Sequence, residues 1–187
     1  MQEPENILRI LRGTKEAIRD EDVVKLKDLS NQTIHSASVA QDTNSILIAV
    51  IVYSLSKILE RTNYKQYPEY KKFFKHLTAH IDKAITAVKA NNEIKLRDEL
   101  NNIRKDISKL TGNFKRQVQN VFQRAKINKA SRIYEHGISM EKTSKLLGIT
   151  IWELAEYAGQ TGIGDVDLGV TMPAKQRVKL AVDFFKK

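Results

Sequence analysis

The sequence contains no cysteine among its 187 residues, and it has only 8 glycines and 3 prolines. Without cysteine there can be no disulfide bond and no thiolate metal site, which agrees with a cytoplasmic protein. Five of the eight glycines fall between Gly148 and Gly169. Because glycine and proline interrupt helices, their scarcity before residue 148 predicts long helices there. We therefore expect an all-α protein.

Signals for export and for membrane insertion are also lacking. The first residues, Met1 to Glu5, are acidic and do not have the charged and then apolar design of a secretory signal. The most apolar segment, Ile46 to Tyr53, meets Ser54 and Lys57 before it reaches the roughly 20 residues that a membrane span needs. We interpret this segment as a buried helix of a bundle, and we expect no contact with a membrane.

Apolar residues at helical spacing predict four helices in the first part of the chain. The first covers residues 6–18, and the second follows the acidic run Asp20-Glu21-Asp22 and ends near Gln41. Asp42 can cap a third helix, which is apolar on every side and is therefore expected to be enclosed by the others. Pro68 suits the first turn of a fourth helix. Together these elements predict a helical bundle.

Apolar residues then recur at steps of three or four from Leu96 to Ala125, which predicts a long amphipathic helix that is also basic. An interruption at Thr111-Gly112-Asn113 is the alternative. Such a stripe can pack in its own bundle or in a coiled-coil dimer, and the other apolar helices favour the bundle. We predict two units, a helical bundle at residues 1–110 and a second unit at residues 111–187.

The segment from Ile127 to Leu154 carries the packing positions of two helices joined by a tight turn. Ser144 is small where the helices would cross, and Leu147 is the apolar residue before the turn. Gly148 tolerates the left-handed backbone that such a turn needs. The segment therefore predicts a turn at Gly148 between two crossing helices.

Both of these helices also have start signals. Ser139 can cap the first, and Thr150 and Glu153 form a T-x-x-E capping box for the second. With the packing positions above, these residues resemble the helix-turn-helix family of DNA-binding domains, with a leading helix at residues 127–136. The resemblance covers only the C-terminal part of the chain.

The resemblance implies that the second helix of the motif enters the major groove of DNA. Arg, Lys, Asn or Gln near the start of that helix would then contact the bases. The residues at these positions are Ile151, Trp152, Glu153, Glu156 and Tyr157, none of which is basic. We expect Glu153 to be occupied by capping and base reading of the usual kind to be weak.

The positive charge lies before the turn instead. The chain has a net charge of +10, and residues 95–145 alone carry 13 Lys and Arg against 5 Asp and Glu. Such a field attracts phosphates, with strong salt dependence and little sequence choice. A solvated face of a lysine-rich protein is the alternative interpretation. The candidate nucleic-acid-binding residues are Lys115, Arg116, Arg124, Lys126, Lys129, Arg132, Lys142 and Lys145, with Trp152 and Tyr157 on the groove side.

These observations favour a non-enzymatic nucleic-acid-binding protein, most simply a transcription-regulator-like protein that binds DNA. A second interpretation is an RNA- or ribosome-associated protein whose basic helix contacts RNA while the motif contacts protein. A third is an antitoxin-like regulator whose bundle holds a protein partner. A last helix expected from Thr171 could pack across the motif or form the contact of a homodimer. No cofactor is implied.

Three other patterns give weaker indications of a binding site or an activity. His76 and His80 have a spacing that can bind zinc, but no third ligand is evident, and a packing or surface role is favoured. The N-terminal bundle loosely resembles HEPN-type bundles, whose nuclease members carry an Arg and a His at a longer spacing than Arg132 and His136, so cleavage is not expected. Aromatic and lysine residues alternate in the segment 64–75, where core packing is favoured over binding of single strands.

Overall fold

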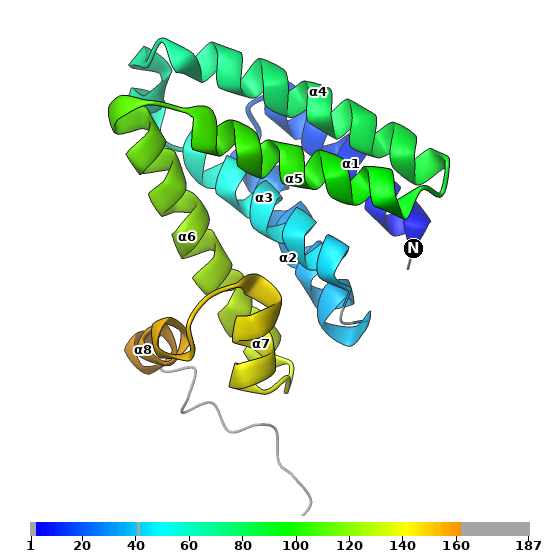
Figure 1. The fold of residues 1–187 in the computed structure, drawn as a ribbon, viewed down its shortest axis with the longest axis vertical. Helices are drawn as coiled ribbons and strands as arrows, with labels where there is room; N and C mark the ends of the chain where they lie inside the picture. Colours follow the sequence, from blue (N-terminus) through cyan, green and yellow to red (C-terminus); the bar gives the residue numbers. More distant parts are fainter. Residues whose placement is uncertain (1–2, 41, 162–187) are drawn as a thin grey trace, which may run out of the picture.

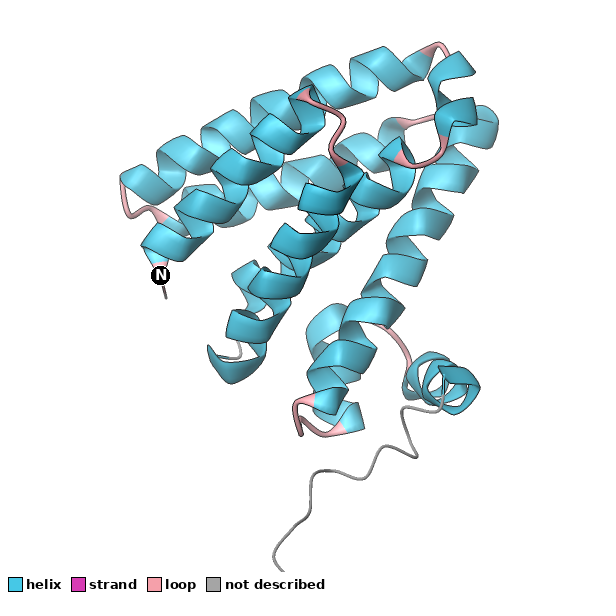
Figure 2. Cartoon of the chain, turned by 180° about the vertical axis from the view of Figure 1, so that it is seen from behind, coloured by secondary structure: helices cyan, strands magenta, loops and turns pink. Residues whose placement is uncertain are grey.

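The computed structural model describes residues 3–40 and 42–161 (Figure 1, Figure 2). Over these residues the chain forms eight α-helices, one short 3-10 helix and no strand, which confirms the expectation of an all-α protein. The helices are α1 (Pro4–Arg19), α2 (Val23–Ala40), α3 (Thr43–Leu59), η1 (Thr62–Gln66), α4 (Glu69–Lys89), α5 (Glu93–Lys109), α6 (Gly112–Glu135), α7 (Met140–Leu147) and α8 (Ile151–Thr161).

The first five α-helices form a layered bundle. α2 packs along α3, α4 packs along α5, and α1 contacts both α2 and α4. In Figure 1, α4 and α5 run side by side across the upper part, and α6 descends from the end of α5. α6 packs against α3 and carries α7 and α8 at its lower end.

α3 is the enclosed helix that its sequence predicts. Its residues are buried without a gap from Ile48 to Val52, so no face of the helix reaches solvent there. The Asp42 side chain caps its first turn, accepting hydrogen bonds from the backbone N–H groups of Asn44 and Ser45 at 3.3 and 3.0 Å. The cap satisfies donors that have no partner inside the helix.

The stripe from Leu96 to Ala125 belongs to two helices, so the prediction of one long helix is wrong and the alternative is confirmed. Leu110 and Thr111 have extended backbones, and Gly112 has a φ of +56°. Because glycine adopts such angles without a steric cost, the chain turns sharply there. The leading helix expected at residues 127–136 is the second half of α6.

Buried apolar side chains form one cluster that extends from Ile7 in α1 to Leu154 in α8. Val118 and Phe122 of α6 belong to it, so the division expected between residues 110 and 111 crosses the core. That division stays a prediction. None of the described helices is long and apolar enough to span a membrane. The last helix expected from Thr171 lies outside the described residues.

Candidate nucleic-acid interface

The turn between α7 and α8 is built by the signals that the sequence contains. The Ser139 hydroxyl accepts a hydrogen bond from the Lys142 N–H at 3.3 Å at the start of α7. Gly148 ends α7 with a φ of +61°, in the left-handed region. In α8, Glu153 N–H donates to Thr150 Oγ1 at 3.1 Å, and Thr150 N–H donates to Glu153 Oε2 at 2.8 Å. The predicted caps, turn and capping box are therefore confirmed.

α8 crosses α6 instead of running along it, as Figure 1 shows with α8 almost end-on beside α6. Leu154 and Ala158, one turn apart, are buried where α8 contacts α6 and α7. Gln123 of α6 donates to Glu153 Oε1 at 2.9 Å, and Asn128 donates to the Tyr157 hydroxyl at 3.1 Å. Side-chain bonds therefore attach the first turn and the middle of α8 to α6.

The outer surface of α8 is apolar to acidic. Trp152 is 83% exposed and Ile151 is 44% exposed, whereas the helix contains no Lys or Arg. Glu153 is occupied: bonds from the Thr150 backbone and hydroxyl, and then from Gln123, lower the pKa of its carboxyl. As expected from its capping role, Glu153 has little capacity left to contact a base.

The basic residues of α6 do not lie on one face. Successive residues of an α-helix are about 100° apart around the axis, so Lys126 lies about 20° from Lys115, whereas Arg124 lies about 180° from it. Arg116, on a third side, is hydrogen-bonded to Asn113. The four side chains therefore cannot all contact one nucleic acid along this helix.

Lys129 departs from the expected surface position, because only 1% of its surface is exposed. Its Nζ donates to Asn31 Oδ1 of α2 at 3.0 Å and lies 4.3 Å from the centre of the Tyr53 ring of α3. Burial, and then the nearby Arg132, lower its pKa to about 8. Lys129 is thus a component of the interface between helices, not part of a phosphate-binding surface.

Arg132 in the last turn of α6, and Lys142 and Lys145 in α7, are exposed. Arg132 pairs with Glu135 at 3.0 Å, and Lys145 pairs with Glu141 at 2.6 Å. Since both pairs are solvent-exposed, they hold the side chains only weakly, and a phosphate can compete for them.

Lys126 lies on the rim of a groove of about 550 Å³ between α3, α5 and α6. Arg104 of α5 lies on the same rim, and burial together with Arg104 lowers the pKa of Lys126. Leu47 and Phe122 belong to the apolar lining. Arg104 escaped the sequence-based selection because its partner on the rim is 22 residues away in another helix.

Arg124 and Tyr157 lie together on the opposite flank of α6. They line a cleft of about 590 Å³ with Tyr53 and Lys57 of α3 and with Arg61, which lies just beyond the end of that helix. Nothing in the local sequence around these α3 residues signals a site. They become neighbours of Arg124 only because α3 and α6 pack together.

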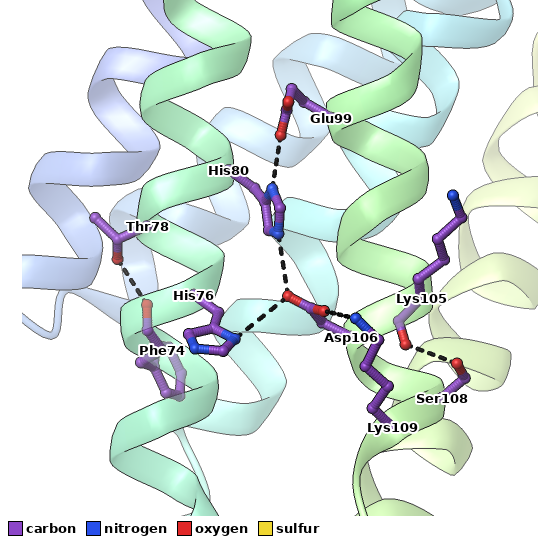
Figure 3. Close-up of polar contacts among 9 residues, drawn as sticks. All are labelled: Phe74, His76, Thr78, His80, Glu99, Lys105, Asp106, Ser108 and Lys109. Carbon is purple, nitrogen blue, oxygen red and sulfur yellow. Dashed lines mark hydrogen bonds and ion pairs between the residues drawn. The ribbon is translucent and has the colours of Figure 1, made fainter.

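The two histidines of α4 bind carboxylates. Figure 3 shows His80 between Glu99 and Asp106 of α5, at 2.6 and 3.0 Å, while His76 lies 3.6 Å from Asp106. Although burial acts in the opposite direction, bonds from Lys109 and His80 lower the pKa of Asp106. Among the described residues no cluster of His, Asp or Glu side chains is arranged to hold a metal ion.

The residues of the other two weak patterns, the Arg132–His136 pair and the aromatic segment 64–75, make contacts within the fold. His136 Nδ1 lies 2.7 Å from the Arg132 carbonyl oxygen, and its Nε2 lies 3.0 Å from His35 of α2, so His136 joins two helices. In the aromatic segment, Tyr64 and Phe73 pack edge-on against the buried ring of Phe114. These contacts are of the packing type that the sequence favours.

Comparisons with protein-family models, with curated proteins and with solved structures gave no match to this chain. The functional argument therefore depends on the geometry of α6, α7 and α8 and on the charges around them.

Proposed function

We propose that this chain is a non-enzymatic nucleic-acid-binding protein of the helix-turn-helix type, with duplex DNA as the favoured target. The observation that carries the proposal is the arrangement of α6, α7 and α8. A left-handed Gly148 and a reciprocal capping box set α8 across α6, with Trp152 exposed at the start of α8. In helix-turn-helix proteins this helix is the one that meets the groove.

Phosphate contacts supply most of the affinity in this proposal. Lys126, Arg132, Lys142 and Lys145, in the second half of α6 and in α7, reach the surface and would make these contacts. Because α8 itself has no basic side chain, it adds little sequence-specific readout. We therefore expect binding that is sensitive to salt and tolerant of sequence.

The test is the anisotropy of a fluorescent duplex DNA titrated with the full chain between 50 and 200 mM salt. Removing one phosphate contact should reduce the slope of log affinity against log salt by about one unit. Arg132→Gln and Lys145→Gln should each show this, while Lys83→Gln, an exposed lysine on α4, should not. Duplex DNA left unbound at the lowest salt would defeat the proposal for DNA.

One observation favours a second candidate, an RNA-associated protein. The exposed Ile151 and Trp152 give α8 an apolar surface suited to contact with a protein, a second copy of the chain included. In that case the basic residues bind structured RNA, and an RNA hairpin should bind more tightly than duplex DNA of matched length. Trp152→Ala would then leave the RNA affinity unchanged. If Trp152→Ala lost affinity while Arg132→Gln and Lys145→Gln did not, the assignment of binding to the basic residues would be contradicted.

A further inference from the structure

The cleft beside Arg124 combines three helices that are distant in sequence. α3 contributes Tyr53, Lys57 and, just beyond its end, Arg61. α6 contributes Arg124 and Asn128, and α8 contributes Tyr157 and Gln160. Its volume of about 590 Å³ is in the range of clefts that bind small molecules.

The walls of the cleft carry more positive than negative charge. Among the described residues that line it, Lys57, Arg61 and Arg124 are basic and Glu60 is the one carboxylate. That carboxylate already accepts hydrogen bonds from Lys27 and Lys57, both at 2.8 Å, and these bonds lower its pKa to about 2. Arg124 has no hydrogen bond or ion pair with any described residue. An anion of suitable size would therefore find an unpaired guanidinium in the cleft, the group that binds phosphate best.

A second ammonium group, that of the buried Lys129, lies close to the Tyr53 ring of the cleft. The buried ammonium of Lys129 lies 4.3 Å from the centre of the Tyr53 ring, and that of Lys57 lies 5.7 Å from the same ring. In the part of the chain that the structure describes, Lys129 donates to an amide, that of Asn31, and pairs with no carboxylate. Negative charge bound in the cleft would lower the electrostatic cost of this buried amine, since opposite charges interact strongly where water is excluded.

The remaining lining consists of two tyrosines, two amides and three apolar residues of α6, Val121, Ala125 and Ile127. Tyr53 and Tyr157 are both partly exposed, and they come from different helices. Asn128 uses its amino group to bond the Tyr157 hydroxyl at 3.1 Å, and Gln160 uses its amino group to bond Glu156 at 3.3 Å. Within residues 3–40 and 42–161, no hydrogen bond is made to the amide oxygens of Asn128 and Gln160, so both can accept one from a ligand. Aromatic rings together with amide acceptors suit a planar base that carries an amino group.

We propose that this cleft binds a nucleoside phosphate, with the phosphate at Arg124, Arg61 and Lys57 and the base at Tyr53 and Tyr157. The cleft is distinct from the surface around Lys126 of the nucleic-acid interface proposed above, because Lys126 lines a different groove on the other flank of α6. Since Tyr157 and Gln160 belong to α8, the bound ligand contacts the same helix that carries Trp152. It would therefore stabilise the attachment of α8 to α6.

The test is isothermal titration calorimetry of the full chain, without nucleic acid, against AMP, adenosine and inorganic phosphate. AMP should bind at a single site at least about tenfold more tightly than either fragment, because it uses both halves of the cleft. Arg124→Gln should weaken AMP at least about fivefold through the loss of a charge-assisted contact. Arg116→Gln, an exposed arginine on the same helix outside the cleft, is the matched control and should leave the affinity within about twofold.

A second pair of variants tests whether the ring of Tyr157 contacts the base. Tyr157→Leu keeps an apolar side chain for packing but removes the stacking surface, and it should weaken AMP severalfold. Tyr157→Phe keeps the ring and should bind AMP nearly as the wild type does. Circular dichroism of each variant establishes that the helices are formed before its affinity is compared.

Three outcomes would overturn the proposal: no saturable heat with AMP at millimolar concentration, equal affinities for AMP and inorganic phosphate, or equal weakening by Arg124→Gln and Arg116→Gln. None of them bears on the titrations with duplex DNA or RNA, which are carried out without AMP. A chain that binds AMP but no nucleic acid defeats the proposed function alone, and the reverse result defeats the cleft alone.

Discussion

Lys129 lies at a buried position of the helical pattern of α6, although lysine side chains are usually exposed. It lies four residues after Ala125 and seven after Phe122, so it continues the stripe of α6 that faces α3. Lysine is almost never fully buried without a partner of opposite charge. At this position, however, the packing of the helix decides, and the amine is accommodated by Asn31 and by the ring of Tyr53. The periodicity of the apolar stripe indicated that residue 129 is buried, but the identity of the residue as lysine led to the expectation of an exposed side chain.

Replacing this lysine by methionine should stabilise the protein. A base whose pKa is lowered to about 8 on folding, from 10.5, is charged at pH 7 at a cost to the folded state. Lys129→Met removes that charge and keeps the length of the side chain, so we expect a gain of about 1–3 kcal/mol at pH 7. Urea denaturation measures it.

The pH dependence of the same comparison has a definite sign. Between about pH 8 and pH 10.5 the unfolded chain binds a proton at Lys129 that the folded chain has already released. The stability of the wild type should therefore rise through this window relative to Lys129→Met. Lys83→Met, at an exposed position, should alter neither the stability nor its slope. A Lys129→Met variant less stable than the wild type at pH 7 would mean that the contacts with Asn31 and Tyr53 outweigh the cost of the buried charge.

Glu60 should act at the acidic end of the pH range. Hydrogen bonds from Lys27 of α2 and then Lys57 of α3 lower its pKa to about 2, from 4.5. A depressed carboxyl pKa contributes stability above pH 4.5, and this contribution is lost as the pH falls towards 2. Glu60→Gln should therefore be less stable than the wild type at pH 7, and the difference should shrink in denaturation experiments near pH 2.5. Asp28→Asn on the exposed face of α2 serves as control and should show no such convergence.

At the scale of the element, two glycines near the ends of α7 and α8 have opposite consequences. An added Cβ meets nothing within 4 Å at Gly148 or at Gly159, so neither substitution causes a clash. Gly148 has a φ of +61°, where alanine is strained, and Gly148→Ala should cost about 1 kcal/mol. Gly159 lies inside α8 without a positive φ, and Gly159→Ala should raise the free energy of unfolding by about 0.5–1 kcal/mol. Thermal unfolding followed by circular dichroism separates the two, and equal shifts in one direction would contradict this account of the turn.

The elements themselves were largely predictable because their signals are local. Asp42, Ser139 and Gly148 act within one turn of the chain, and the Thr150–Glu153 box spans three residues. Such contacts form as soon as the helix forms, so the sequence specifies them without knowledge of the tertiary structure. The same locality explains why the break at Gly112 could be foreseen as an alternative.

The candidate sites were much less predictable, because they depend on which helix faces come together. Lys129 and Asn31 are 98 residues apart, and the cleft joins residues of α3, α6 and α8. The charge count of residues 95–145 indicated a positive region but could not divide it between the two flanks of α6. Arg104, Lys57 and Arg61 were therefore missed, and Arg124 and Lys126 were grouped although they line different hollows.

At the scale of the whole molecule, the central question is whether α6 to α8 form a unit separate from the bundle. Val118, Val121 and Ala125 of α6 belong to the same buried cluster as Leu55 of α3. A helix that supplies core residues to a bundle cannot unfold without exposing the core of its neighbours. We therefore expect α3 and α6 to unfold together, in spite of the division into two units that the sequence suggested.

Native-state hydrogen exchange with Leu55→Ala measures this coupling. Leu55 is fully buried in α3, and its truncation should cost about 2–5 kcal/mol. If α3 and α6 exchange through one global opening, the amides in the middle of both helices should lose protection by the same free energy, although the substitution lies in only one of them. Protection in α6 that is unchanged by Leu55→Ala would instead establish two independent units.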